Sequence, residues 1–185
     1  MMKVLGISGT IIGAKPAAVV KKILDCIYEK TGWEVELLDL AKYKVEFCDG
    51  RNIEDYSEDT QIVIQKVTEA DAYIIGTPIF NGSFPAPLKN VIDLVPPNVF
   101  QRKVIGFAAA GGNPNHYLVI ENQLKPIAGY LKAYVAPTYC FTNRDSFDAN
   151  NQIIDQEVLA TIDQMVHEVV NLLKVVNQPN ERVAF

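Results

Sequence analysis

Residues 72–93 read AYIIGTPIFNGSFPAPLKNVID, and this stretch decides the fold of the chain. Its apolar start, residues 73–77, is typical of a buried strand, and residues 86–95 have the spacing of an amphipathic helix. A Gly-Thr-Pro turn and a loop with an aromatic side chain join the two. In an open α/β sheet, such a strand end presents backbone amides and an aromatic edge to a flat ligand.

The rest of the chain repeats this alternation of strand and helix. The other expected strands are residues 2–8, 33–40, 103–109 and 134–141. The other expected helices are residues 15–30, 59–69, 115–131 and 155–176, and residues 41–58 form a long connection. Strict alternation favours a parallel sheet with helices on both faces, and five strands favour the flavodoxin-like order 2-1-3-4-5. We therefore predict an α/β, three-layer, flavodoxin-like domain over residues 1–177, with a polar tail at 178–185.

Composition restricts the classes of function. The 185 residues are 49% hydrophobic and carry a net charge of -5 without a lysine and arginine cluster, which argues against a nucleic-acid partner. Because the sequence contains no apolar run of 18 residues or more, we expect no membrane span. Cys26, Cys48 and Cys140 are an odd number and far apart, so we expect free thiols and a cytoplasmic location. The first residues enter a strand with no signal-peptide pattern.

The loop after the first strand, residues 8–15, combines hydroxyls and glycines with a helix start. Ser8, Thr10 and Lys15 are the candidate ligands of an anion there, because free N–H groups and the helix dipole both favour negative charge. The spacing matches neither a Walker A loop nor a serine-hydrolase elbow. An ordinary strand-to-helix turn remains the alternative.

The loop after the third strand offers a wall for a planar ring. The residues that we expect beside the ligand are Thr77, Pro78, Ile79, Phe80 and Asn81. For Phe84 we favour a place in the core or in a subunit interface. For Phe80, burial and contact with the ligand remain equal alternatives.

The loop after the fourth strand reads AAGGNPNH from residue 109 to 116. Gly111 and Gly112 let the backbone approach a ring with no side chain between them, and Asn113 follows directly. A plain turn with an asparagine cap is the alternative. His116 either donates to the ligand or is a solvated histidine. It shares no element with His167, so we predict no metal site.

Two of these motifs resemble the NADPH-dependent FMN reductase family, whose fold is flavodoxin-like. TPIFNGSFPAPLKNVID is similar to the family pattern T-P-x-Y-x-x-S-x-P-x-x-L-K-N-x-I-D, and AAAGGNPNH is similar to its glycine pair after a strand of small residues. The region from residue 116 to 132 looks most like the branch that supplies reduced flavin to alkanesulfonate monooxygenases. Two positions differ: Phe80 stands where the family has tyrosine, and residues 11–14 stand where relatives carry Arg, Ser and Asn.

The resemblance implies that Ser8, Thr10 and Lys15 hold the FMN phosphate. Residues 78–81 would then lie beside the isoalloxazine, and residues 111–113 at its pyrimidine side. Hydride would pass from NADPH or NADH to FMN, and no residue is nominated as a general acid or base. With so few cations, we expect moderate affinity and an exchangeable flavin.

Several alternatives and partners accompany this reading. FMN could be a fixed prosthetic group of a quinone or azo reductase, or the chain could be an electron-transfer flavodoxin or a flavin-free domain. Arg102 and Arg144 are interpreted as surface charges, and pairing with the phosphates of the nucleotide is the alternative for each. The family implies a homodimer or homotetramer and a flavin-dependent monooxygenase as partner. The apolar residues that suggest a contact with a second copy are Phe84, Pro85, Val95, Pro96, Pro97, Val99 and Phe100.

Overall fold

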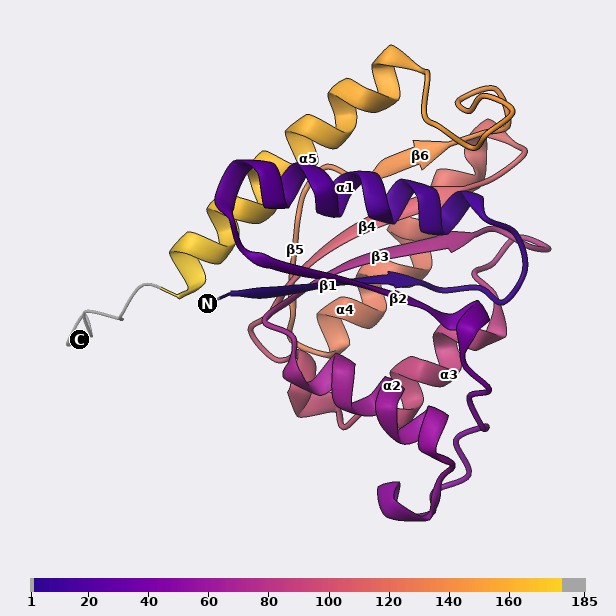
Figure 1. Cartoon of the computed structure of the whole chain (residues 1–185), viewed down its shortest axis with the longest axis vertical. Coiled ribbons are helices and arrows are strands. Elements are labelled where there is room, and N and C mark those ends of the chain that lie inside the picture. The colour runs from indigo at the N-terminus through magenta and orange to yellow at the C-terminus, as the bar shows by residue number, and fades with distance from the viewer. Residues whose placement is uncertain (1, 178–185) are drawn as a thin grey trace.

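A parallel sheet forms the centre of the molecule in the computed structural model, which describes residues 2–177 (Figure 1). The strands are β1 (Lys3–Ser8), β2 (Glu34–Asp39), β3 (Ala72–Pro78), β4 (Val104–Ala110), β5 (Tyr134–Val135) and β6 (Cys140–Thr142). The main helices are α1 (Lys15–Thr31), α2 (Glu58–Glu69), α3 (Ala86–Leu94), α4 (Lys125–Tyr130) and α5 (Gln156–Val176). The sheet order β2-β1-β3-β4-β5 confirms the predicted fold. The predicted tail at 178–185 lies outside the described residues.

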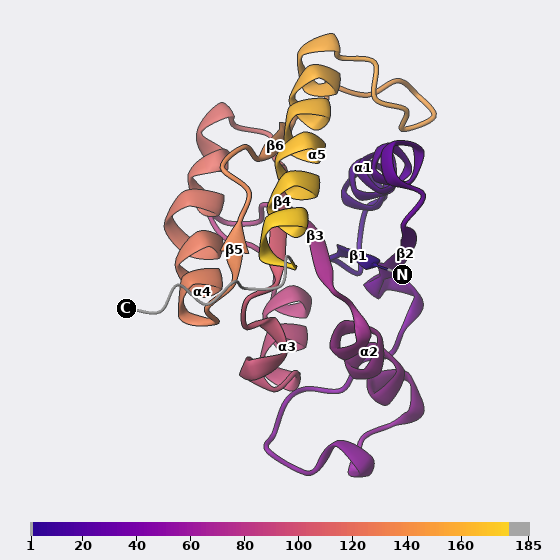
Figure 2. The same cartoon turned by 90° about the vertical axis from the view of Figure 1, so that its left-hand side faces the viewer.

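The helices cover both faces of the sheet, as Figure 2 shows most clearly. On one face, α1 and α5 enclose a core with alternate strand residues such as Val4 and Ile74. On the other face, α2, α3 and α4 pack against the neighbouring residues, such as Leu5 and Tyr73. Both faces of the strands are buried, which explains their continuous apolar sequences.

The predicted fifth strand is divided in two. β5 and β6 both pair in parallel with β4, and residues 136–139 separate them. Pro137 lies in this gap, and proline has no N–H to donate to a ladder. The N–H of Thr138 donates instead to the Glu168 carboxylate of α5, at 2.7 Å. Because of this break, β6 ends beside the end of β4, with Thr142 paired to Ala110, and the loop after β6 begins there.

The predicted helix over residues 115–131 is also wrong as a single element. It is a short 3-10 turn (Pro114–Tyr117), a π-helical turn (Ile120–Leu124) and then α4. The N–H of Lys125 reaches back five residues to the carbonyl of Ile120. Pro126 has no N–H for the usual bond to residue 122, so the interior of an ordinary helix is disfavoured there.

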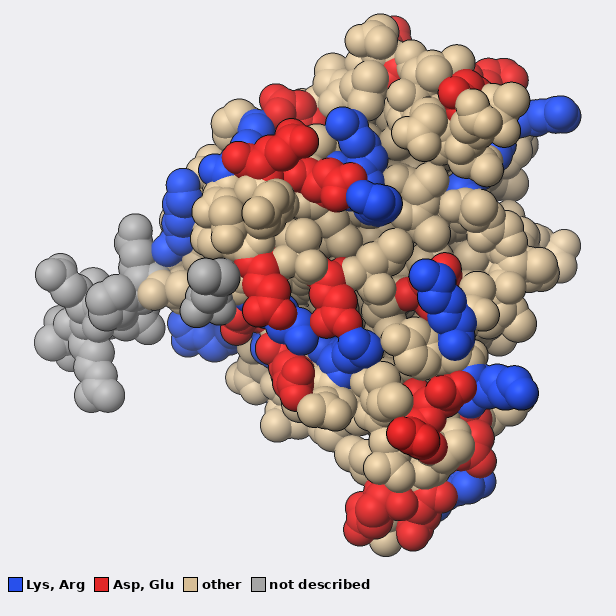
Figure 3. Space-filling view, in the orientation of Figure 1, with Lys and Arg blue, Asp and Glu red and all other residues tan. Residues whose placement is uncertain are grey.

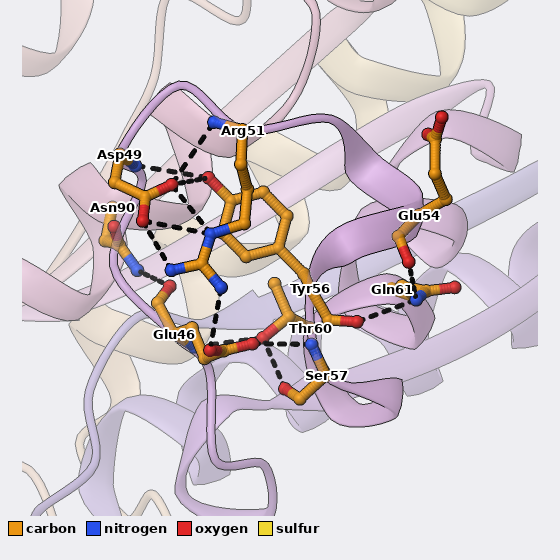
Figure 4. Close-up of polar contacts among 9 residues, drawn as sticks. All are labelled: Glu46, Asp49, Arg51, Glu54, Tyr56, Ser57, Thr60, Gln61 and Asn90. Carbon is orange, nitrogen blue, oxygen red and sulfur yellow. Dashed lines mark hydrogen bonds and ion pairs between the residues drawn. The ribbon is translucent and has the colours of Figure 1, made fainter.

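The long connection after β2 has ordered structure of its own (Figure 4). It contains the short 3-10 helices Leu40–Lys42 and Ile53–Asp55. The Arg51 side chain donates to Asp49 at 2.9 Å and to Glu46 at 3.3 Å, and the Arg51 guanidinium holds the pKa of the Asp49 carboxyl well below its usual range. Asn90 of α3 donates to the Glu46 carbonyl at 2.9 Å and accepts from the Cys48 N–H at 2.9 Å. The connection is thus fastened to α3.

Among residues 2–177, no helix combines the length and the hydropathy that crossing a membrane requires.

Candidate functional site

A cavity of about 370 Å³ opens at the carboxyl edge of the sheet. The strands that form this edge end on the right of Figure 1. Four segments line the cavity: the start of α1 with the loop before it, the ends of β3 and β4, and the residues after β6. The lining residues are Ile12, Gly13, Lys15, Pro16, Pro78, Ile79, Phe80, Ala110, Gly111, Gly112, Asn143 and Arg144. The volume is within the range of about 300–1,000 Å³ that is typical of small-molecule sites.

The loop after β1 leaves the N-terminus of α1 available to a ligand. Ala14 precedes the helix and provides no side-chain cap, so no side chain satisfies the first N–H groups of α1. The Thr10 hydroxyl is buried and used within the loop, where it donates to the Ile12 carbonyl at 2.9 Å. Lys15 lines the cavity, whereas Ser8 and Thr10 do not. Ser8 is fully buried, and its Oγ has no hydrogen-bond partner among the described residues.

A tight two-residue turn positions Phe80 after β3. Phe80 and Ser83 exchange backbone hydrogen bonds of 2.9 and 3.1 Å around Asn81 and Gly82, whose φ angles are 52° and 81°. Asn-Gly with two positive φ values is the usual sequence of this turn. Phe80 is 42% exposed and faces the cavity, while Asn81 lies in the turn outside the lining. Gln123 anchors the turn by accepting from the Ser83 hydroxyl at 2.6 Å.

The other residues that were expected near Phe80 differ in whether they reach the cavity. Pro78 and Ile79 line the cavity beside it. Thr77 is fully buried behind them and donates its hydroxyl to the Pro78 carbonyl at 3.0 Å. Phe84 is half-buried against the core, as predicted.

The glycine pair after β4 forms a wall without side chains. Gly111 donates its N–H to the Thr142 carbonyl at 2.9 Å, and Gly112 follows at the cavity rim. A Cβ at Gly111 would lie only 2.6 Å from His116 Nδ1, so His116 packs directly behind the glycine. His116 Nδ1 is buried without a partner in the described chain, and the ring does not line the cavity. Asn113 instead caps the following turn by accepting from the Asn115 N–H at 2.9 Å.

The residues after β6 form a fourth wall that the sequence analysis did not include. Asn143 and Arg144 line the cavity because β6 ends beside β4, with Thr142 paired to Ala110. Arg102 precedes β4, at the opposite edge of the sheet. The division of the predicted fifth strand concealed this wall, and Pro137 was the available signal.

Charge is sparse around the cavity. Figure 3 shows the right-hand rim mainly in tan, whereas acidic side chains gather at the bottom, over the connection that contains Glu54 and Asp55. Lys15 and Arg144 are the charged side chains among the lining residues described above, and both are cationic. The cavity therefore combines apolar walls with two cationic residues, which suits a planar ring that carries an anionic group.

Comparisons with known proteins agree with this geometry. The family model described as NADPH-dependent FMN reductase matches residues 2–147. An NAD(P)H-dependent FAD/FMN reductase of Geobacillus thermodenitrificans is 48% identical over 92% of this chain and 93% of its own length. An FMN reductase (NADPH) of Pseudomonas aeruginosa is 30% identical over 55% of this chain and 54% of its own length.

Solved structures show the same fold. An oxidoreductase from Corynebacterium diphtheriae superimposes with a TM-score of 0.75 at 17% identity, covering 94% of this chain and 98% of the other. The sequence comparisons thus confirm the predicted family, and the solved structures confirm the predicted fold. This chain belongs to the NADPH-dependent FMN reductase family and is an oxidoreductase.

Proposed function

We propose that this protein reduces FMN with NADPH or NADH at the carboxyl-edge cavity. The phosphate would lie at the start of α1, near Lys15, and the ring between Phe80 and the wall of Gly111 and Gly112. When bound, the flavin accepts hydride from the nicotinamide and passes electrons to a second acceptor or leaves in reduced form. The observation that carries the proposal is the convergence of these loops on one mainly apolar cavity that Lys15 and Arg144 also line.

The residues present fit this cofactor. The N-terminus of α1 has no side-chain cap and suits a phosphate. Ser8 does not line the cavity, but its buried hydroxyl lies directly before this loop and lacks a partner in the described chain. A Cβ at Gly13 or at Gly112 would meet no atom within 4 Å, so the backbone is open at both ends of the cavity.

The contribution of the protein is to orient the ring of the ligand within the cavity. The Asn81-Gly82 turn holds the backbone of Phe80 at the cavity, and the small residues Ala110 and Gly111 let a planar ring approach the backbone. No carboxylate or imidazole lies among the cavity-lining residues that the structure describes, so these residues supply no proton donor of that kind. Orientation and backbone N–H groups are the contributions that such a site makes to hydride transfer.

The direct test is steady-state oxidation of NADPH and NADH, followed by absorbance, with FMN as acceptor. The expected result is FMN-dependent turnover, and quinone and azo dyes are tested in parallel. No turnover with any acceptor would contradict the proposal. An FMN titration completes the test: a micromolar dissociation constant, about -8 kcal/mol, suits a flavin that is released as product.

We further propose that the protein is a homodimer or homotetramer. Between α3 and α4 lies a mainly apolar groove of about 450 Å³ that includes Ile92, Ile127 and Tyr130, and the Tyr130 side chain is 80% exposed. Val95 and Phe100, which were predicted for a contact patch, are 1% and 2% exposed and belong to the core. The contact surface is therefore shifted toward α4.

A flavin-dependent monooxygenase that consumes reduced FMN is the proposed protein partner. We place both in the cytoplasm, where free thiols such as Cys26, Cys48 and Cys140 persist.

A further inference from the structure

We infer that the segment after β6, residues 143–147, completes the phosphate end of the FMN site with two side chains. Arg144 would bind the phosphate directly, and Phe147 would position Lys15 for the same anion. The inference rests on the proposed function, because it assigns residues to the flavin of that site. It places part of the phosphate site on a segment remote in sequence from the loop after β1.

The loop after β1 cannot supply enough charge alone. A phosphate monoester carries about -1.5 to -2 charges at neutral pH. Residues 9–14 contain no cation, and Ile11 and Ile12 are 60% and 66% exposed where a binding loop would display polar groups. Lys15 is the cation that this loop brings to the cavity. A second cation from another element would balance the charge.

Arg144 meets the requirements for that second cation. Its side chain lines the cavity together with Lys15 and Gly13, and it has no ion-pair partner among residues 2–177. Its backbone is held in place, because the Asn143 side chain accepts from the N–H groups of Asp145 at 2.8 Å and Ser146 at 3.1 Å. The planar guanidinium fork suits a phosphate, which it can bind with two hydrogen bonds.

Phe147 acts on the other cation. The Lys15 ammonium lies 5.0 Å from the centroid of the Phe147 ring, a cation–π distance. Phe147 is 8% exposed and pairs with Ile153 in an antiparallel bridge, so its ring is fixed in the packed interior. A flexible lysine stem is thereby restrained at the cavity before any ligand binds. Phe147 is a positioning residue for Lys15 and does not line the cavity itself.

The experiment compares two flavins that differ only in the phosphate. FMN and riboflavin are titrated into the full chain, with quenching of flavin fluorescence as the readout, for wild type, Arg144→Gln, Phe147→Leu and Phe147→Tyr. Arg102→Gln is the matched control, because it removes the same charge at the opposite edge of the sheet. Each titration is repeated at high salt.

Arg144→Gln should raise the dissociation constant of FMN about tenfold and leave that of riboflavin unchanged, because one charge-assisted contact is lost. Phe147→Leu should raise the FMN constant about threefold, and Phe147→Tyr should restore it, since the aromatic face returns. High salt should narrow the gap between FMN and riboflavin in wild type more than in Arg144→Gln. Arg102→Gln should behave as wild type.

Three outcomes would overturn the inference while the proposed function stands. One is an unchanged FMN constant in Arg144→Gln. Another is an equal loss of FMN and riboflavin affinity, which would assign Arg144 a structural role. A third is a raised KM for NADPH with unchanged FMN binding, which would assign the guanidinium to the nicotinamide cofactor. Failure of wild type to bind either flavin would instead refute the proposed function.

Discussion

At the residue scale, the two adjacent glycines after β4 have different reasons to be glycine. Behind Gly111 the side chain of His116 occupies the space that a Cβ would need, with 2.8 Å to the His116 Cβ as well as 2.6 Å to the ring. Around Gly112 a Cβ would meet no atom within 4 Å, yet this residue lines the cavity. Gly111 therefore has a packing reason to be glycine, whereas the proposed function assigns the open space at Gly112 to the ligand.

Alanine at each position separates the two roles. Gly111→Ala should lower the free energy of unfolding by about 1–3 kcal/mol, because His116 must move to accommodate the methyl group. Gly112→Ala should unfold at the wild-type temperature but bind FMN more weakly. Thermal unfolding and FMN titration of both variants test this. A stable Gly111→Ala, or a destabilised Gly112→Ala, would contradict the assignment.

Phe80 provides a further prediction at this scale. Phe80→Ala should raise the dissociation constant of FMN about tenfold, because an aromatic contact and its buried area are lost, whereas Phe80→Tyr should keep wild-type affinity. Phe47→Ala is the control, since Phe47 is 76% exposed and lies outside the cavity lining. If Phe80→Ala binds FMN as wild type does, the ring of Phe80 is not part of the site.

At the element scale, Glu168 stabilises the break between β5 and β6. Its carboxylate accepts from the N–H and the hydroxyl of Thr138, each at 2.7 Å. Burial acts to raise the pKa of Glu168, but the hydrogen bonds from Thr138 outweigh it and hold the pKa below its usual value. The carboxylate thus provides a partner for the Thr138 N–H, which has none in the sheet, and it connects residues 136–139 to α5.

The pH dependence follows from that direction. Because the folded pKa is below the unfolded one, the stabilisation is present at neutral pH and is lost as the pH falls below about 4. Glu168→Gln should lower the free energy of unfolding by about 1–2 kcal/mol at pH 7. The difference in the free energy of unfolding between Glu168→Gln and wild type, measured by urea unfolding, should become smaller in acid. Glu29→Gln, an exposed change on α1, should have little effect at either pH.

The divided strand and the divided helix show how far the sequence could predict this structure. Apolar runs and helical spacing gave the order of strands and the two-sided core, because burial on both faces leaves a strong signal. Pro126 and Pro137 mark the two elements that were predicted as continuous and are not. The spacing of apolar residues does not show where a strand is interrupted. The position at which β6 ends beside β4 could therefore not be predicted, and neither could the place of Asn143 and Arg144 at the cavity. His116 was unpredictable for a related reason, since its packing against Gly111 is a tertiary contact.

At the scale of the whole molecule, the apolar groove between α3 and α4 lies on the face of the sheet opposite α1, whose N-terminus lines the cavity. The lining of the groove includes Ile92, Ile127 and the exposed Tyr130. Large aromatic side chains at the centre of an interface contribute much of its binding energy. In the proposed dimer, the opening beside Lys15 and Arg144 would stay on another surface.

The proposed dimer is tested by light scattering at micromolar concentration. Wild type should have the mass of a dimer or tetramer, and Tyr130→Glu should shift it toward monomer, because a charge would be buried in the contact. Tyr28→Glu is the control, since Tyr28 is 59% exposed on α1, across the sheet. A monomeric wild type, or an effect of Tyr28→Glu alone, would contradict the proposed contact surface.

The division of the last strand has a consequence for solubility. An unpaired strand at the border of a sheet is a template on which another chain can add, and long flat edges favour aggregation. Here one border consists of β5, with two residues, and β6, with three, separated by Pro137. The other border, β2, carries the acidic residues Glu34, Glu36 and Asp39. Interruption makes one border a poor template for another chain, and the charged side chains of β2, two of them paired with lysines, do the same at the other.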